Sequence, residues 1–179
     1  MLDKILVAID ESYASQCAFE AALRLAKALD AELLLVHILD VFSSDSPGHV
    51  LEVVDLCLSA RDEQRLKDNY EAKMTELIGR YDALLKEKEE EAKAAGVIAQ
   101  YVQPHGRPGP SICKAAEEHN IDLVVVGNRD RSTLTELVPG SVSNYVVHHA
   151  PCSVTIVHAD MHKNSAKVQT PEFALSQAS

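Results

Sequence analysis

The sequence contains no tryptophan, and aromatic residues make up only 4% of its 179 residues. Hydrophobic residues still account for 46% of the chain, so we expect a core built mainly from aliphatic side chains. No apolar run approaches the roughly 20 residues that a membrane-spanning helix needs, and the first residues show no signal-peptide pattern. We therefore expect a cytoplasmic protein that has no membrane partner.

Basic residues are also scarce, because 17 Lys and Arg face 27 Asp and Glu, which gives a formal net charge of −10. This balance argues against a nucleic-acid partner, since nucleic acids are bound through clustered basic side chains. It does not exclude a small anion held by backbone amides, because that attraction is local.

The four cysteines form no closely spaced pair, so the sequence predicts neither a zinc site nor a disulfide framework. They stand at Cys17, Cys57, Cys113 and Cys152. We interpret them as buried thiols in a reducing cytosol. The adjacent His148 and His149 point in different directions on a helix and have no evident third ligand, so we expect no metal there.

Five short apolar runs alternate with segments of helical periodicity. The runs predict strands over residues 5–9, 32–38, 97–102, 123–126 and 153–158. Ser12 is expected to cap the helix that separates the first two strands. This alternation predicts an α/β fold, a three-layer sandwich around a five-stranded, parallel, doubly wound sheet.

A long insertion separates the second and third predicted strands, at about residues 41–96. Residues 42–48 have the composition of a loop, and residues 50–58 are apolar but ambiguous between helix and strand. From about residue 59 to 95 the pattern is helical, with one apolar stripe formed by Leu66, Tyr70, Met74, Leu77, Tyr81 and Leu84. We interpret the charged residues 86–91 as the solvated end of this helix, with an interaction surface as the alternative.

The domain is expected to cover residues 1–159. The remaining residues, 160–179, are polar and patternless, and we expect a disordered tail.

Polar or glycine residues follow three of the predicted strands, at Asp10, His37 and Gly127. Doubly wound sheets bind ligands beyond the carboxyl ends of their strands, where the strand order switches. Gly127 would let the chain leave its strand with unusual dihedrals and let a ligand approach the backbone. Downstream, Gly140-Ser141 can start a helix whose free N–H groups attract an anion.

These residues therefore predict a backbone cradle for phosphate. It is not a P-loop, because the Gly-Lys-Ser/Thr ending is missing. It is not the dinucleotide fingerprint either, because the first strand is followed by Asp10-Glu11-Ser12, which contains no glycine.

Three blocks of the sequence resemble the universal stress protein family. They are KILVAIDES at residues 4–12, LVH at 35–37 and DLVVVGNRDRSTLTELVPGSVSNYVVHHAPCSVTIV at 122–157. The resemblance covers roughly residues 1–158 and implies a five-stranded parallel sheet with helices on both faces, similar to adenine-nucleotide α-hydrolases. Those enzymes have a Ser-Gly-Gly-rich loop after the first strand, which is absent here, so ATP pyrophosphatase chemistry is not expected.

Many members of that family bind ATP through glycine, two residues, glycine, nine residues, then Gly-Ser or Gly-Thr. Gly127 and Gly140-Ser141 match at this spacing, but Asp130 replaces the second glycine. Asp tolerates a left-handed backbone, so the loop can still form. A carboxylate ~4 Å from a phosphate would cost ~1–4 kcal/mol. Bound Mg²⁺ would reverse that repulsion, and a monophosphate such as AMP would avoid it.

The resemblance also implies a set of binding residues. Asp10 would contact the ribose or adenine, and the main chain of Ala8, Ile9 and Val36 would flank the base. The phosphates would be lined by Gly127, Arg129, Gly140, Ser141, Val142 and Ser143, with Val126 and Asp130 completing the set. Two alternatives stay open: Asp10 as a helix cap, and Arg129 as a solvated loop residue.

By resemblance we expect a stress-response or signalling protein that binds AMP or ATP, with or without Mg²⁺, and acts by association with an unidentified protein. One alternative is an interaction protein that binds no nucleotide and uses the helical insertion. Another is a weak ATPase, although the spacing reveals no Ser/His/Asp or paired-carboxylate arrangement.

The last predicted strand is expected at an edge of the sheet, where it would pair with its counterpart in a homodimer. Its residues are Ser153, Val154, Thr155, Ile156, Val157 and His158. The alternative is that the tail folds back and covers this edge.

Overall fold

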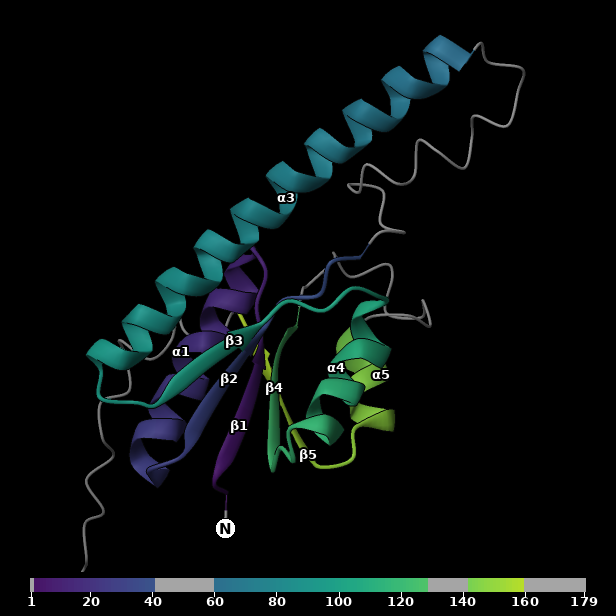
Figure 1. The fold of residues 1–179 in the computed structure, drawn as a ribbon. Helices are drawn as coiled ribbons and strands as arrows, with labels where there is room; N and C mark the ends of the chain where they lie inside the picture. The colour runs from purple at the N-terminus through teal and green to yellow at the C-terminus, as the bar shows by residue number, and fades with distance from the viewer. Residues whose placement is uncertain (1, 41–59, 129–141, 160–179) are drawn as a thin grey trace, which may run out of the picture.

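A computed structural model of the chain describes residues 2–40, 60–128 and 142–159. Within them one parallel sheet lies between two layers of helices (Figure 1). The strands are β1 (Lys4–Ala8), β2 (Glu32–Val36), β3 (Ala99–Val102), β4 (Leu123–Asn128) and β5 (Ser153–His158). Their order in the sheet is β3-β2-β1-β4-β5, and every adjacent pair is parallel. The predicted five-stranded, doubly wound sheet is confirmed.

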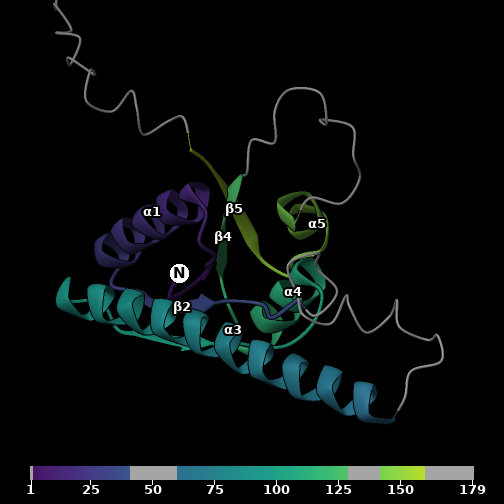
Figure 2. The same cartoon turned by 90° about the horizontal axis from the view of Figure 1, so that it is seen from above.

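Four helices are described, and they cover both faces of the sheet (Figure 2). They are α1 (Tyr13–Leu29), α3 (Ala60–Ala94), α4 (Pro108–Glu118) and α5 (Val142–His149). One core cluster joins α1 and α3 to one face of the sheet, and the other joins α4 and α5 to the opposite face.

Side chains along β1 point alternately to the two faces of the sheet, and this explains why the sequence of the strand is continuously apolar. Ile5 and Val7 pack towards α1 and α3, whereas Leu6 packs towards α4 and α5, and all three side chains are fully buried. A strand covered on both faces has no position left for a polar residue.

Predicted strand boundaries differ from the structure by one or two residues. β2 ends at Val36 instead of residue 38, and β4 continues to Asn128 instead of ending at residue 126. β1 ends at Ala8, although the N–H of Ile9 still donates to the Val36 carbonyl at 2.8 Å. β3 begins at Ala99 instead of residue 97. α4 begins at Pro108 and holds Pro110 in its first turn, where the missing N–H of a proline costs nothing.

The predicted long helix is present as α3, which has 35 residues and is therefore about 52 Å long. Leu85 and Ala92 near its carboxyl end are fully buried against the sheet. Its amino-terminal half extends beyond the sheet (Figures 1 and 2). The segments 42–48 and 50–58 lie outside the described residues.

Candidate functional site

The strand order reverses between β1 and β4, which are neighbours in the sheet. Such a reversal opens a crevice at the carboxyl ends of the two strands, where doubly wound proteins bind their ligands. Here β1 leads into Ile9 and Asp10, and β4 ends with Gly127 and Asn128. The topology thus brings Asp10 and Gly127 to the same edge, as predicted from sequence.

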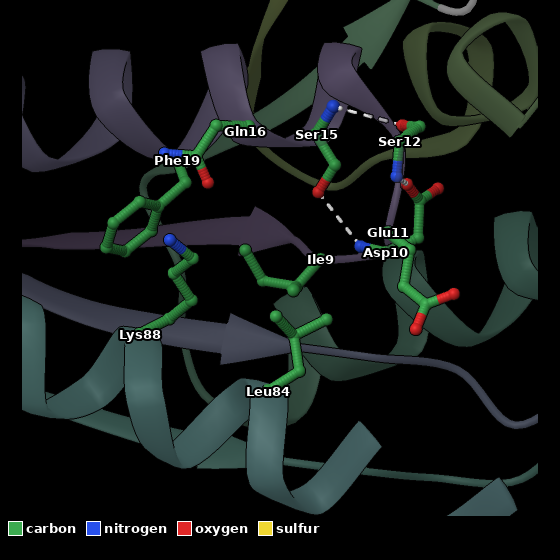
Figure 3. Close-up of a pocket in the computed structure, with 9 residues that line it drawn as sticks. All are labelled: Ile9, Asp10, Glu11, Ser12, Ser15, Gln16, Phe19, Leu84 and Lys88. Carbon is green, nitrogen blue, oxygen red and sulfur yellow. Dashed lines mark hydrogen bonds between the residues drawn. The ribbon is translucent and has the colours of Figure 1, made fainter. Parts of the chain in front are cut away.

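The loop between β1 and α1 is held by short-range hydrogen bonds, two of which Figure 3 shows. Ser15 Oγ accepts from the Asp10 N–H at 2.9 Å, and Ser12 Oγ accepts from the Ser15 N–H at 3.1 Å. Asp10 Oδ1 accepts from the Ser12 N–H at 2.7 Å. Ser12 is therefore the N-cap of α1, as predicted, while Asp10 stabilises the turn that precedes it.

The main chain expected beside the base already makes internal hydrogen bonds. The Ile9 N–H donates to the Val36 carbonyl, and the Ile9 carbonyl accepts from His37 Nδ1 at 2.8 Å. Ser15 Oγ lies 3.4 Å from the Ala8 carbonyl, to which it donates. A ligand at this position would use the second lone pairs of these carbonyls.

The candidate residues divide between the two faces of the sheet. Ala8, Val36 and Val126 belong to the cluster beneath α4 and α5, whereas Ile9 belongs to the cluster beneath α1 and α3. Ser143 is the second residue of α5, and it is buried. One group of candidates is therefore placed by the structure on the α4/α5 face, next to the start of α5.

One part of the prediction for Gly127 is wrong, whereas the approach of a ligand to its backbone stays a prediction. Gly127 lies inside β4 and is not among the residues with positive φ, so the expectation of unusual dihedrals is wrong. A Cβ at this position would lie 2.4 Å from the carbonyl oxygen and 2.6 Å from the carbonyl carbon of Ala14. Glycine is required here because the first turn of α1 packs directly against β4.

Four predicted site residues lie outside the described residues: Arg129, Asp130, Gly140 and Ser141. The phosphate cradle consequently stays a prediction. The next residue, Val142, is partly exposed and begins α5, which agrees with a helix start immediately after Gly140-Ser141.

A buried aromatic pair at the same edge was missed from sequence. The His37 ring is only 7% exposed and stacks on Tyr81 of α3, with ring centroids 3.6 Å apart and 14° between the planes. Burial lowers the pKa of His37, against the opposing effects of the Ile9 carbonyl and of Asp10 and Glu11. The imidazole is therefore neutral at neutral pH and donates from Nδ1.

Next to this pair, Arg80 of α3 forms an ion pair with Glu11 of the β1–α1 loop. The two residues are 69 positions apart in sequence, so no local pattern could have revealed the contact.

A cavity of about 100 Å³ lies between this loop, α1 and α3 (Figure 3). Asp10 and Ser12 line one side, and Leu84 and Lys88 of α3 line another. Ligand pockets usually measure about 300–1,000 Å³, so this cavity is too small for a nucleotide. It also lies towards α1 and α3, away from the α4/α5 face that carries Ala8, Val36 and Val126.

Within residues 2–40, 60–128 and 142–159, no group of three or more His, Cys, Asp or Glu could hold a metal ion. The helices of these segments include none that is long and apolar enough to cross a membrane. Cys17, Cys113 and Cys152 are free thiols, and burial raises the pKa of Cys113 and of Cys152. Cys57 lies outside the described residues.

The fold defines a doubly wound α/β protein, a class in which ligands generally bind at the strand switch point. The family model for the universal stress protein family matches residues 1–158, and the chain belongs to that family. Among curated relatives, universal stress protein YxiE of Bacillus subtilis is 34% identical over 160 residues, which is 88% of this chain and 99% of the relative. Universal stress protein Sll1388 of Synechocystis is 30% identical over 154 residues, 86% of this chain and 96% of the relative.

Solved structures of the family share the fold. UspA from Lactobacillus plantarum is 25% identical, with a TM-score of 0.63 over 87% of this chain and 97% of that one. A universal stress protein in complex with cAMP is 26% identical, with a TM-score of 0.59 over 88% of this chain and 98% of that one. An Arabidopsis thaliana family protein with AMP bound is 21% identical, with a TM-score of 0.54 over 87% of this chain and 91% of that one, a likeness in fold alone.

Proposed function

We propose that the protein binds an adenine nucleotide, AMP or ATP with or without Mg²⁺, in the crevice at the carboxyl ends of β1 and β4. The observation that carries this proposal is the grouping of Ala8, Val36 and Val126 on the face that also holds the start of α5. Val36 and Val126 are only 1% and 2% exposed, so it is the main chain at these strand ends that would flank a base, while the helix N-terminus on the same face would hold a phosphate. The family neighbour in complex with cAMP, which is 26% identical, supports the same ligand class.

The parts of the ligand are assigned by chemistry. Asp10, at the end of β1, can accept hydrogen bonds from ribose hydroxyls, and N–H groups at the start of α5 would donate to the phosphate oxygens, where the positive end of the helix dipole favours an anion. Arg129 and Ser141 would add donors to the phosphate. Asp130 would favour AMP, or ATP with Mg²⁺, over free ATP, because its carboxylate repels the outer phosphates.

The test is the thermal stability of the purified protein with AMP, cAMP, ADP and ATP, each with and without Mg²⁺. We expect a concentration-dependent rise in Tm for at least one nucleotide, because a ligand that binds only the folded state stabilises it. Gly140→Val should abolish the rise by blocking approach to the backbone, whereas Gly79→Ala on α3 should keep it. No rise with any nucleotide, or the same rise in a folded Gly140→Val variant, would refute the proposed site. Phosphate release from ATP in the same samples tests the weak-ATPase alternative.

In this proposal the protein acts as a cytoplasmic stress-response or signalling protein through association, and it forms a homodimer through β5. β5 is an edge strand, as predicted, and pairs with β4 alone among the described strands. Ile156 on this strand is 37% exposed, which is high for a large apolar side chain. An exposed β-branched edge favours antiparallel pairing with the same strand of a second copy.

An interaction protein that binds no nucleotide is the second candidate, and one observation favours it. The amino-terminal half of α3 extends beyond the sheet, and described side chains such as Lys67, Glu71 and Lys73 are exposed there. A Tm that stays at its ligand-free value with every nucleotide would favour this second function if a protein partner is also captured and Lys73→Glu abolishes its binding.

A further inference from the structure

Two neighbouring side chains of α3 contact the edge of the sheet that carries Asp10. Arg80 pairs with Glu11, and its guanidinium carbon lies 5.4 Å from the centre of the Tyr81 ring. Tyr81 in turn stacks on His37, which follows β2. One turn of a helix far away in sequence thus contacts both the β1–α1 loop and the segment that holds it.

His37, which stacks on Tyr81, also forms a hydrogen bond with the main chain after β1. Its Nδ1 lies 2.8 Å from the carbonyl oxygen of Ile9, and since a carbonyl only accepts, Nδ1 carries the proton in this bond. The Ile9 N–H is fixed as well, by the carbonyl of Val36. The Ile9–Asp10 peptide is therefore held at its carbonyl by a ring that α3 keeps in place, and at its N–H by Ser15 Oγ.

The rest of the loop is not tightly packed. The cavity of about 100 Å³ separates Asp10, Glu11 and Ser12 from Leu84 and Lys88 of α3 (Figure 3). The Arg80 and Glu11 side chains are 56% and 48% exposed, so this ion pair adds little to global stability. The loop is fixed by its own short-range hydrogen bonds, but it has free volume on the side of α3, so a change in its contacts with α3 can shift it.

We propose that α3 controls the nucleotide site: Tyr81, through His37, and Arg80, through Glu11, hold the β1–α1 loop in its binding conformation, and a bound nucleotide holds this part of α3 in return. The inference rests on the proposed function. The second half follows from the first, because coupling between two sites is reciprocal.

The first experiment needs no nucleotide. Hydrogen exchange of peptides covering residues 8–16 is compared in wild type, Arg80→Gln, Tyr81→Ala and the charge-matched control Lys73→Gln. We expect the amides of Asp10, Ser12 and Ser15 to exchange several-fold faster in Arg80→Gln and in Tyr81→Ala. In the control they should exchange at the wild-type rate. Tyr81→Phe, which keeps the stacked ring, should restore protection. Wild-type exchange in both Arg80→Gln and Tyr81→Ala overturns the inference.

The second experiment measures AMP and ATP affinity by calorimetry for the same variants. Couplings of this kind typically change affinity by 5-fold or more, so we expect binding at least about fivefold weaker in Tyr81→Ala and restored in Tyr81→Phe. AMP should also slow exchange of residues 77–92 in wild type and not in the Arg80→Gln/Tyr81→Ala double variant. Unchanged affinity in that double variant overturns the inference. If wild type binds neither AMP nor ATP, the proposed function fails and control of binding by α3 fails with it, while the exchange data still decide whether α3 holds the loop.

Discussion

Replacing Gly127 by alanine separates two explanations of this residue. If glycine is there for the ligand, Gly127→Ala should weaken binding and leave the fold intact. The structure predicts a loss of stability instead, because the new methyl group would lie 2.4 Å from the Ala14 carbonyl oxygen. The obstruction is backbone in the first turn of α1, so no flexible side chain can yield, and the helix start must move by about 1 Å to restore a normal contact.

The expected size follows from two opposing effects. Inserting a methyl group into a tightly packed site typically costs about 1–3 kcal/mol, and a backbone obstruction belongs at the upper end. Alanine recovers roughly 0.5–1 kcal/mol, because it loses less conformational freedom on folding than glycine does. The net prediction is a loss of about 2–2.5 kcal/mol. In a domain of this size it corresponds to a fall in Tm of roughly 4–10 °C.

Urea unfolding followed by circular dichroism measures this loss, and Gly79→Ala is the matched control. Nothing lies within 4 Å of a Cβ at Gly79, which is on an exposed position of α3, so the same substitution should stabilise that helix by up to about 1 kcal/mol. A lower free energy of unfolding for Gly127→Ala and a higher one for Gly79→Ala would support the packing explanation. A Gly127→Ala protein as stable as wild type would show that α1 does not approach β4 in this way.

Three further predictions concern the ligand, the sheet edge and the buried histidine. Asp130→Gly should raise ATP affinity about tenfold more than AMP affinity if ~1.4 kcal/mol of repulsion is relieved; calorimetry that finds equal gains for both nucleotides would contradict the placement of Asp130. Ile156→Pro removes a backbone donor at the exposed β5 edge, so light scattering should shift from dimer towards monomer, whereas Ile156→Val should stay dimeric. Burial lowers the pKa of His37 below the ordinary 6.5, so on acidification the unfolded chain is protonated at this residue before the folded chain is. The stability that comes from the neutral buried imidazole is therefore lost as the pH falls from about 7 through the lowered pKa of the folded state. His37→Asn should therefore lose less stability than wild type between pH 7.5 and pH 5 in urea titrations, and an identical loss would contradict the buried neutral imidazole; the exposed His148→Asn is the control.

The elements of the fold could be predicted because the signals that define them are local. β1 and β4 are continuous apolar runs, since both of their faces are buried, and Ser12 is a capping residue directly before a helical pattern. Boundaries were less accurate. Ile9 keeps a ladder-like hydrogen bond beyond the end of β1, so its sequence pattern is that of a strand residue.

The contacts of the site could not be predicted, because they depend on how distant elements lie against one another. The stripe on α3 identifies Tyr81 as an inward-facing residue, but only the placement of α3 on the sheet selects His37 as its partner. Gly127 illustrates the same limit from the other side. Sequence shows that a side chain is absent, and the structure is needed to show that the backbone at Ala14 fills its place.

The alternation of faces along the strands limits how α3 can affect a bound nucleotide. Ala8 and Val36 face α4 and α5, whereas Ile9 faces α1 and α3, and His37 lies with Ile9 because it contacts Tyr81. A base beside Ala8 and Val36 is therefore separated from α3 by the sheet itself. The remaining route is the end of β1, where the Ile9–Asp10 peptide carries a hydrogen bond to His37 on one side and leads to the carboxylate of Asp10 on the other. An influence of α3 on binding then acts through this peptide, which His37 holds, or through Glu11, which Arg80 holds, and in both cases loop exchange and affinity should change together from one α3 variant to the next.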